Sequence, residues 1–433
     1  MTRLKAPCSL LLILVLLGLP VPASAYSVLT HEELIDLAWN DCIRPFLLSR
    51  YPHTSEAALG QAHAYAYGGS AIQDMGYYPF GKEFFSNLTH YVRSGDFVAS
   101  LFHNARNVDE LAFAVGALSH YLGDNIGHSE CINPATAVEF PKLAKKYGEF
   151  VTYDQAPHAH VRTEFAFDVN QLSHHRLASA TYLRHVGFKV PRRLVERAFY
   201  ETYGLYLREV LGPEIPAVRS YRTAVRSFIP RFAHAETVIH GKHFPPDVED
   251  EAFQQFQYQV DHADFQKHWA GRKHAGFLPH VLAIVIVIVP KIGPVSDLAI
   301  RGPNQQTEEW YVRSVNDTMK EFHQELADLR THTDSPLSLP NRDLDTGELI
   351  QPGSYPLTDK TYAKLLHRLT ADPVRQVPEG LRRDILAFYS DSEAPIVTKK
   401  NHKAWKRVQE ELAKLRELPS AQSSPGSASA STR

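Results

Sequence analysis

Apolar side chains recur every three to four residues along most of the chain, and no long run alternates strictly between apolar and polar positions. Such spacing gathers apolar side chains on one face of an α-helix. The pattern predicts helices over residues 31–48, 107–128, 192–211, 217–239, 250–269, 305–331 and 399–415. Thr30 is a suitable N-cap for the first helix, and Pro230 is expected to kink or split the fourth. Because no β-α unit repeats, we predict an all-α fold.

Three segments interrupt the helical pattern. Residues 1–25 combine a positively charged start, a short apolar run and an Ala-Ser-Ala ending. This arrangement predicts a secretory signal peptide cleaved after Ala25, and therefore a secreted or periplasmic protein. Residues 340–359 are rich in Pro, Gly and Asp and are expected to form a loop or a small hairpin. Residues 419–433 form a Ser/Ala/Gly tail that is expected to be disordered.

Residues 277–290 are the most apolar stretch after the predicted signal peptide. The run is short for a membrane span, and Pro279, His280 and Pro290 interrupt it. We favour a buried core segment. The alternative is a partly exposed apolar edge that makes transient contact with a membrane surface.

The chain carries 46 Lys and Arg residues against 48 Asp and Glu residues, so its net charge is close to zero. This balance excludes the strongly basic surface of a general nucleic-acid binder. With 23 His and only 3 Cys, the composition favours metal sites built from nitrogen and oxygen ligands over thiolate zinc modules. Cys42 and Cys131 follow the predicted signal peptide, and the sequence is consistent with either a disulfide or two buried thiols.

The predicted helix 107–128 carries His120, Asp124 and His128 at intervals of four residues. This spacing places the three side chains on one helix face. Each interval advances a helix by about 6 Å, so the two histidines lie about 12 Å apart along its axis. A zinc ion binds its ligands at about 2 Å, so we expect at least two metal ions here rather than one ion shared by both histidines.

His160 and Glu164 form a second pair at the same spacing, for which a solvent-exposed helix face is the alternative interpretation. His31, Asp74 and His90 carry no signal individually. Together with the first group, however, they concentrate imidazole and carboxylate side chains within one helical region. This density favours a metal centre.

Cleavage after Ala25 would leave Tyr26 as the first residue, five positions before His31. Its free α-amine, with an ordinary pKa of about 8, can bind a metal ion once it is deprotonated. The new N-terminus therefore becomes a candidate ligand together with His31.

These residues, in their order along the chain, resemble the zinc-dependent phospholipase C family, which is similar in fold to the fungal single-strand-specific zinc nucleases. The segment His-Tyr-Leu-Gly-Asp at 120–124 is especially similar to the central helix of that family. The resemblance implies a helical cleft that holds two to three zinc ions. By this resemblance, the main chain of Tyr26 and the side chain of His31 would bind the first ion, and Asp124 would bridge it to the second. The second ion would also be bound by Asp74, His90 and His120. The third ion would be bound by His128, His160 and Glu164.

The resemblance covers residues 26–170, and it implies a metal-binding helical region over 26–185. Residues 186–418 would be a helical continuation of unassigned role. The first residue is Tyr where secreted bacterial members of the family have Trp, but its ligand atoms belong to the backbone. Its short spacing to His31 is similar to that of the glycosylphosphatidylinositol-specific phospholipase D branch.

One spacing departs further from the family pattern. The four-residue interval between Asp124 and His128 is shorter than usual. This departure leaves His103 and His158 as alternatives to His128 at the third ion.

The resemblance also implies hydrolysis of a phosphate diester by metal-activated water. Zinc ions held by nitrogen and oxygen ligands neutralise charge at phosphorus and lower the pKa of bound water to about 7. Asp74, as a ligand close to that water, is the expected general base. The predicted function is a secreted phospholipase C acting on phospholipids.

There are three alternatives to this function. A zinc nuclease acting on single-stranded nucleic acid would need aromatic stacking surfaces and basic side chains, which the near-neutral charge does not favour. A phospholipase that cleaves glycosylphosphatidylinositol lipids would use the same metal chemistry. A helical protein with purely structural metals would be expected to have closed, Cys-rich sites, unlike this set of ligands.

Overall fold

The computed structural model describes residues 26–77, 81–211, 219, 245, 250–269, 302–332 and 336–421. Within these ranges the chain is predominantly helical, and its β pairing is limited to two isolated bridges, Arg342 with Leu349 and Val377 with Ser420. The predicted all-α fold is confirmed. The predicted signal peptide, nearly all of the predicted helix 217–239 with Pro230, the apolar segment 277–290 and the tail beyond residue 421 lie outside the described residues.

The first part of the chain, up to residue 173, contains the region in which the candidate ligands lie. Its helices are α2 (Val28–Ala38), α3 (Arg44–Arg50), α4 (Glu56–Gly69), α5 (Glu83–Tyr91), α6 (Ser94–Asn104), α7 (Val108–Gly127), α8 (Asn133–Glu139), α9 (Pro141–Tyr147) and α10 (Pro157–Ser173). Two π-helical turns, Trp39–Ile43 and His128–Ile132, and a 3-10 turn, Gln73–Tyr77, connect some of them.

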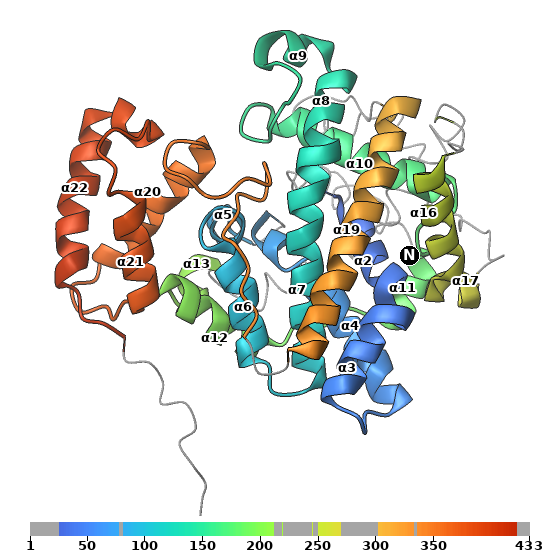
Figure 1. The fold of residues 1–433 in the computed structure, drawn as a ribbon. Coiled ribbons are helices and arrows are strands. Elements are labelled where there is room, and N and C mark those ends of the chain that lie inside the picture. Colours follow the sequence, from blue (N-terminus) through green and yellow to red (C-terminus); the bar gives the residue numbers. More distant parts are fainter. Residues whose placement is uncertain are drawn as a thin grey trace, which may run out of the picture.

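The second part of the chain contributes helices to the same hydrophobic core. These helices are α11 (Ala180–Val186), α12 (Arg192–Tyr203), α13 (Leu207–Leu211), α16 (Glu251–His262), α17 (Asp264–Trp269), α19 (Gln305–Thr331), α20 (Pro356–Thr370), α21 (Glu379–Phe388) and α22 (His402–Glu417). Figure 1 shows the long helix α19 lying beside α7, while α20, α21 and α22 form a group at one side of the molecule.

Helix α7 lies at the centre of this arrangement, packed against α4, α6 and α19. Its N-cap is Asn107, the first residue of the predicted helix 107–128, whose side chain accepts a hydrogen bond of 2.9 Å from the backbone N–H of Glu110. Every residue from Leu111 to Asn125 is buried. A helix that is buried on all sides can carry polar side chains only where they have partners, so its histidines and aspartate require an explanation.

Two glycines allow α4 and α7 to approach closely. A Cβ atom at Gly116 of α7 would lie 2.0 Å from the carbonyl oxygen of Ala66, and one at Gly69 of α4 would lie 2.0 Å from that of Phe113. Both neighbours are backbone atoms, which cannot move without shifting the helix. The contact brings the end of α4 against α7, where Ser70 reaches His120.

Several helix boundaries differ from the prediction. Helix α2 begins at Val28, with Ser27 as its N-cap, so Thr30 lies within the helix and the predicted cap was wrong. The predicted helix 192–211 is divided at Gly204, which has a left-handed φ of +63°. The predicted helix 250–269 is divided at Ala263. The predicted helix 305–331 has the bounds of α19.

The segment 340–359, predicted to be a loop or a small hairpin, contains a small hairpin closed by the bridge between Arg342 and Leu349, and its last four residues begin α20. Gly347 turns the chain with a φ of +73°, and a Cβ atom there would lie 2.5 Å from the carbonyl oxygen of Asn125 on α7. The hairpin therefore lies directly against α7.

Of the two interpretations of the cysteines, the structure supports buried thiols, because Cys42 and Cys131 are both buried and unpaired by a disulfide. In the ranges that the structure describes, we find no helix with the length and apolar character needed to cross a bilayer.

Replacement of Gly116 by alanine should destabilise the protein. The added methyl would force α4 and α7 apart, at a cost of about 1–3 kcal/mol in the free energy of unfolding. Gly60, on α4, is a matched control because a Cβ atom there meets nothing within 4 Å. Gly60→Ala should leave stability unchanged or raise it by about 0.5–1 kcal/mol through helix propensity. Chemical denaturation checks both variants, and equal effects would contradict the close helix contact.

Candidate metal centre

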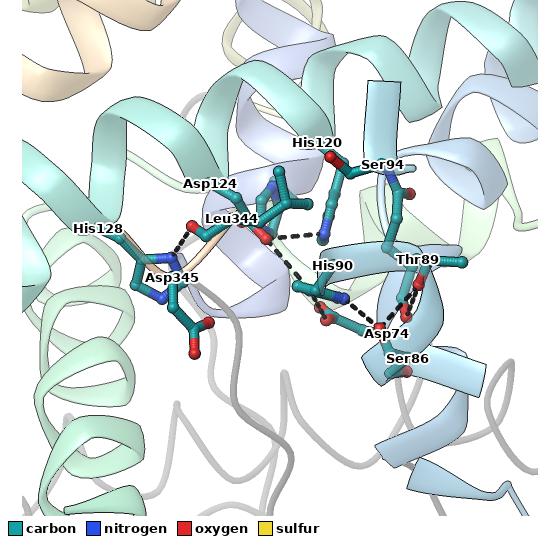
Figure 2. Close-up of polar contacts among 12 residues, drawn as sticks. Asp74, Ser86, Thr89, His90, Ser94, His120, Asp124, His128, Leu344 and Asp345 are labelled. Carbon is teal, nitrogen blue, oxygen red and sulfur yellow. Dashed lines mark hydrogen bonds and ion pairs between the residues drawn. The ribbon is translucent and has the colours of Figure 1, made fainter. Parts of the chain in front are cut away.

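Helix α7 presents His120, Asp124 and His128 on one face, with His128 at the point where the helix passes into a π-helical turn. All three side chains are buried. Figure 2 shows them in a row, with side chains from other elements facing them. Within the described residues, the candidate ligands fall into three groups whose ligand atoms lie within 4.8 Å of one another.

The first group consists of His31 from α2 and His120 and Asp124 from α7. The Nε2 atom of His31 lies 3.2 Å from Oδ1 of Asp124, and Nε2 of His120 lies 3.1 Å from Oδ2. The rings of His31 and His120 stack, with their centroids 4.2 Å apart. The structure thus brings His31, which had no sequence signal of its own, to the predicted face of α7.

The second group consists of Asp74, His90 and His120. Asp74 lies in the 3-10 turn Gln73–Tyr77, and His90 lies on α5. The Nε2 atom of His90 lies 3.3 Å from Oδ1 of Asp74 and 3.3 Å from Oδ2 of Asp124. One oxygen of Asp124 therefore faces the first group and the other faces the second, the arrangement that a bridging carboxylate requires.

The third group consists of His128 with His160 and Glu164 from α10. The Oε1 atom of Glu164 lies 3.1 Å from Nε2 of His160 and 3.8 Å from Nε2 of His128. His128 joins this group in spite of its short spacing from Asp124. The two alternatives, His103 and His158, are exposed and belong to none of the three groups found in the described ranges.

Backbone carbonyls orient three of the histidines. In each case the Nδ1 atom faces a carbonyl oxygen: His90 faces Ser86 at 2.8 Å, His120 faces Ser70 at 2.9 Å, and His128 faces Leu344 at 2.6 Å. Because a carbonyl oxygen can only accept a hydrogen bond, Nδ1 must carry the proton. The opposite nitrogen, Nε2, is then available as a ligand and points into the centre, as in many histidine–metal sites.

Whether a metal ion fits the centre can be judged from the buried nitrogen and oxygen atoms that face it. Those without a hydrogen-bond partner are both carboxylate oxygens of Asp74 and of Asp124 and the Nε2 atoms of His90, His120, His128 and His160. Their approaches to one another are short but lack hydrogen-bond geometry. Leaving a buried polar group unsatisfied costs about 1–3 kcal/mol, and more for a charged group. Imidazole and carboxylate are ligands that zinc prefers, so these residues fit zinc ions.

The same proximity perturbs the pKa values of the groups. Burial acts to lower the pKa of His90, but Asp124 and Asp74 raise it well above its usual value. The pKa of His120 is raised in the same way, against the effect of burial. Burial acts to raise the pKa of Asp124, but the surrounding histidines hold it well below its usual value. Protons on these histidines therefore compete with metal ions for the same positions.

For two other histidines of the centre, the net shift of the pKa is downward, because the effect of burial outweighs that of the neighbouring carboxylates. Burial lowers the pKa of His31, with a further contribution from His120. It also lowers the pKa of His160 to about 4. These two histidines are therefore neutral at pH 7, the form in which an imidazole binds a metal.

Tyr26 lies beside the first group. Its ring is buried and meets the ring of His31 edge-on at a centroid distance of 5.8 Å. Its hydroxyl donates a hydrogen bond of 2.7 Å to Ser314 on α19. A Cβ atom at Gly127 would lie 2.7 Å from the Tyr26 ring, so this glycine makes room for it. The backbone of Tyr26 remains a proposed ligand.

Sequence reasoning missed the part played by the hairpin 340–359. The backbone N–H of Leu344 donates to the carbonyl of His90 at 3.1 Å, while its own carbonyl accepts from His128. The next residue, Asp345, is buried and accepts hydrogen bonds from the hydroxyls of Tyr91 at 2.9 Å and Tyr355 at 2.5 Å. Figure 2 shows Leu344 and Asp345 beside His128. A backbone carbonyl leaves no trace in residue identity, so no sequence signal marks Leu344.

Zinc should stabilise the protein more as the pH rises. The raised pKa values of His90 and His120 mean that their ion pairs stabilise the metal-free protein fully below about pH 6.5 and less as the pH rises through the folded values. A metal ion needs the deprotonated nitrogen. The difference in melting temperature between zinc-loaded and chelator-treated protein should therefore widen from about pH 5.5 to about pH 8.

Two variants check this pH dependence. In His90→Gln the difference in melting temperature should increase less with pH, because the proton on His90 that competes with the metal ion is removed. His103→Gln is the control and should leave the widening intact, because His103 is exposed and outside the three groups. A difference in melting temperature that stays constant with pH would contradict the prediction.

One comparison with known proteins gives a match. The family model described as zinc dependent phospholipase C matches residues 30–212. The match includes every candidate ligand except Tyr26, which precedes it. No curated protein and no solved structure matches the chain significantly. The match over residues 30–212 therefore supports the assignment of this part of the chain to the zinc-dependent phospholipase C family.

Proposed function

We propose that the protein is a phospholipase C that hydrolyses the phosphodiester bond of phospholipids with metal-activated water. One observation carries the proposal. Three adjacent groups of buried nitrogen and oxygen ligands lie within the region that matches the family, and Asp124 and His120 link two of them. Their spacing suits two to three zinc ions, which is the number we propose.

When bound, zinc ions neutralise the charge of a phosphodiester and lower the pKa of bound water to about 7. The protein's own residues hold and orient the reactants. Asp124 joins the first and second groups, and the carbonyls of Ser70 and Ser86 keep Nε2 of His120 and His90 directed inward. This fixed orientation keeps the ligands in place during the reaction.

We propose Asp74 as the general base. Both of its oxygens are buried and without a hydrogen-bond partner, and Oδ1 lies 3.3 Å from Nε2 of His90. A carboxylate in this position can hold the attacking water and accept its proton while it contacts the second group. No nucleophilic side chain is required.

Secretion and the substrate are further parts of the proposal. The signal peptide proposed over 1–25 would deliver the protein to the compartment in which extracellular phospholipids are found. The apolar segment 277–290, for which a buried core position is the favoured interpretation, is the candidate for a transient contact with a membrane surface. A glycosylphosphatidylinositol lipid and single-stranded nucleic acid are the alternative substrates.

Hydrolysis of defined substrates tests the function. The mature protein with zinc should release diacylglycerol and a phosphorylated headgroup from phosphatidylcholine vesicles. Single-stranded DNA and a glycosylphosphatidylinositol-anchored protein should remain intact under the same conditions. Cleavage of DNA without hydrolysis of phospholipid would overturn the proposal, as would hydrolysis that persists after complete removal of zinc.

Asp74→Asn should lower kcat by about 10²–10⁴, because the amide cannot accept the proton from water. Zinc content should be measured in parallel at saturating zinc, so that loss of metal is separated from loss of the base. Asp384→Asn is the matched control, since Asp384 is a largely buried carboxylate that accepts a hydrogen bond of 3.0 Å from Tyr362 on α20. Equal, small losses in both variants would exclude Asp74 as the base.

A further inference from the structure

We propose that Asp168 is a positioning residue that fixes the N-terminal segment, residues 26–31, at the first metal group. The inference rests on the proposed function in one respect, because it takes the α-amine of Tyr26 and the side chain of His31 as ligands of one zinc ion. Neither the spacing of the ligands nor the family match assigns a role to Asp168.

Asp168 lies on the same face of α10 as two candidate ligands. His160, Glu164 and Asp168 follow one another at intervals of four residues along this helix. The first two belong to the third metal group, while Asp168 contacts the start of α2. A single rigid helix therefore connects the third group to the segment that carries the N-terminal ligands.

The carboxylate of Asp168 accepts three hydrogen bonds from the first turn of α2. Its Oδ2 atom accepts from the backbone N–H of Leu29 at 3.1 Å. Its Oδ1 atom accepts from the backbone N–H of Thr30 at 3.1 Å and from the Thr30 hydroxyl at 2.7 Å. All of these groups are buried.

These bonds replace the usual cap of the helix. Ser27, the N-cap residue of α2, makes no side-chain capping hydrogen bond, and the first turn contains no acidic residue. The free N–H groups at a helix N-terminus need acceptors and favour a negative charge. Asp168 supplies both from a neighbouring helix, which ties the position of α2 to that of α10.

The capped turn is the part of α2 that carries the candidate ligands. His31 follows Thr30 directly, and its Nε2 atom lies 3.2 Å from Oδ1 of Asp124. Tyr26 lies just before the helix, with its hydroxyl bonded to Ser314. Metal ligands tolerate errors of only about 0.2 Å in their distances, so a shift of this turn would displace both ligands together.

Asp36 provides a matched control on the same helix. It is also a buried carboxylate, and it accepts hydrogen bonds of 2.6 Å from Tyr67 and 3.0 Å from His63. These contacts lie near the other end of α2 and do not involve its first turn. Removing either carboxylate should lower stability, but only Asp168 should affect the N-terminal ligands selectively.

The experiment compares the mature protein, beginning at Tyr26, with its Asp168→Ala, Asp168→Asn and Asp36→Asn variants. Zinc per chain is counted by elemental analysis after equilibration at buffered free zinc concentrations. The reactivity of the Tyr26 α-amine towards an acylating reagent is followed by mass spectrometry, with zinc and with chelator. A form extended by Met-Gly before Tyr26 defines the zinc content expected when the amine cannot bind.

In the unsubstituted protein, zinc should slow acylation of the α-amine. Asp168→Ala should weaken the binding of one zinc ion by about 10–100-fold and abolish this protection, while the remaining zinc stays bound. Its zinc content at limiting zinc should equal that of the Met-Gly form. Asp168→Asn, which keeps one acceptor oxygen, should be intermediate and provides the test if the alanine variant does not fold. Asp36→Asn should retain full zinc content and protection.

Two results would overturn the inference. One is full zinc content and full protection in both Asp168 variants despite lower melting temperatures, which would make Asp168 only a helix cap. The other is an α-amine in the unsubstituted protein that zinc does not protect. Both readouts are independent of catalysis, so the inference can fail while phospholipid hydrolysis persists, and it can stand if another phosphodiester is the substrate.

Discussion

The buried carboxylate of Asp124 is the constraint on which the rest of the centre depends. Its side chain is fully buried, and histidines from three helices, α2, α5 and α7, lie within 3.3 Å of its oxygens. A buried charge is tolerated only where opposite charge compensates it. Protons on His90 and His120 supply that charge in the metal-free chain, and zinc ions would supply it in the loaded protein. The arrangement of α2 and α5 beside this part of α7 is therefore linked to the positive charge that compensates Asp124.

Several helix bounds and the shared face of the α7 ligands could be predicted from the sequence, because they depend on the periodicity of residues along a helix. The bounds of α19 follow from its apolar spacing, and α7 spans nearly the whole of the predicted helix 107–128. The four-residue intervals between His120, Asp124 and His128 place them on one face regardless of the tertiary fold. The assignment of His31, Asp74 and His90 came from the family resemblance rather than from pattern, because each is isolated in sequence from its partners.

The remainder depends on contacts that residue identity does not encode. The carbonyls of Ser70, Ser86 and Leu344 orient ligands, yet any residue has a carbonyl oxygen. Thr30 resembled a cap because its own side chain can accept a hydrogen bond. In the folded chain its hydroxyl instead donates to Asp168, which is distant in sequence. Local rules of capping could not anticipate a cap supplied by another helix.

The contact between Leu344 and His128 has a consequence for the biosynthesis of the protein. The family match ends at residue 212, but the carbonyl that orients His128 is contributed more than a hundred residues later. Ser314, which anchors Tyr26, is also encoded late. The candidate ligand side chains, from His31 to Glu164, are therefore all synthesised before the carbonyl that orients His128. The arrangement around His128 is therefore complete only after the segment that carries Leu344 has been synthesised and has packed against α7.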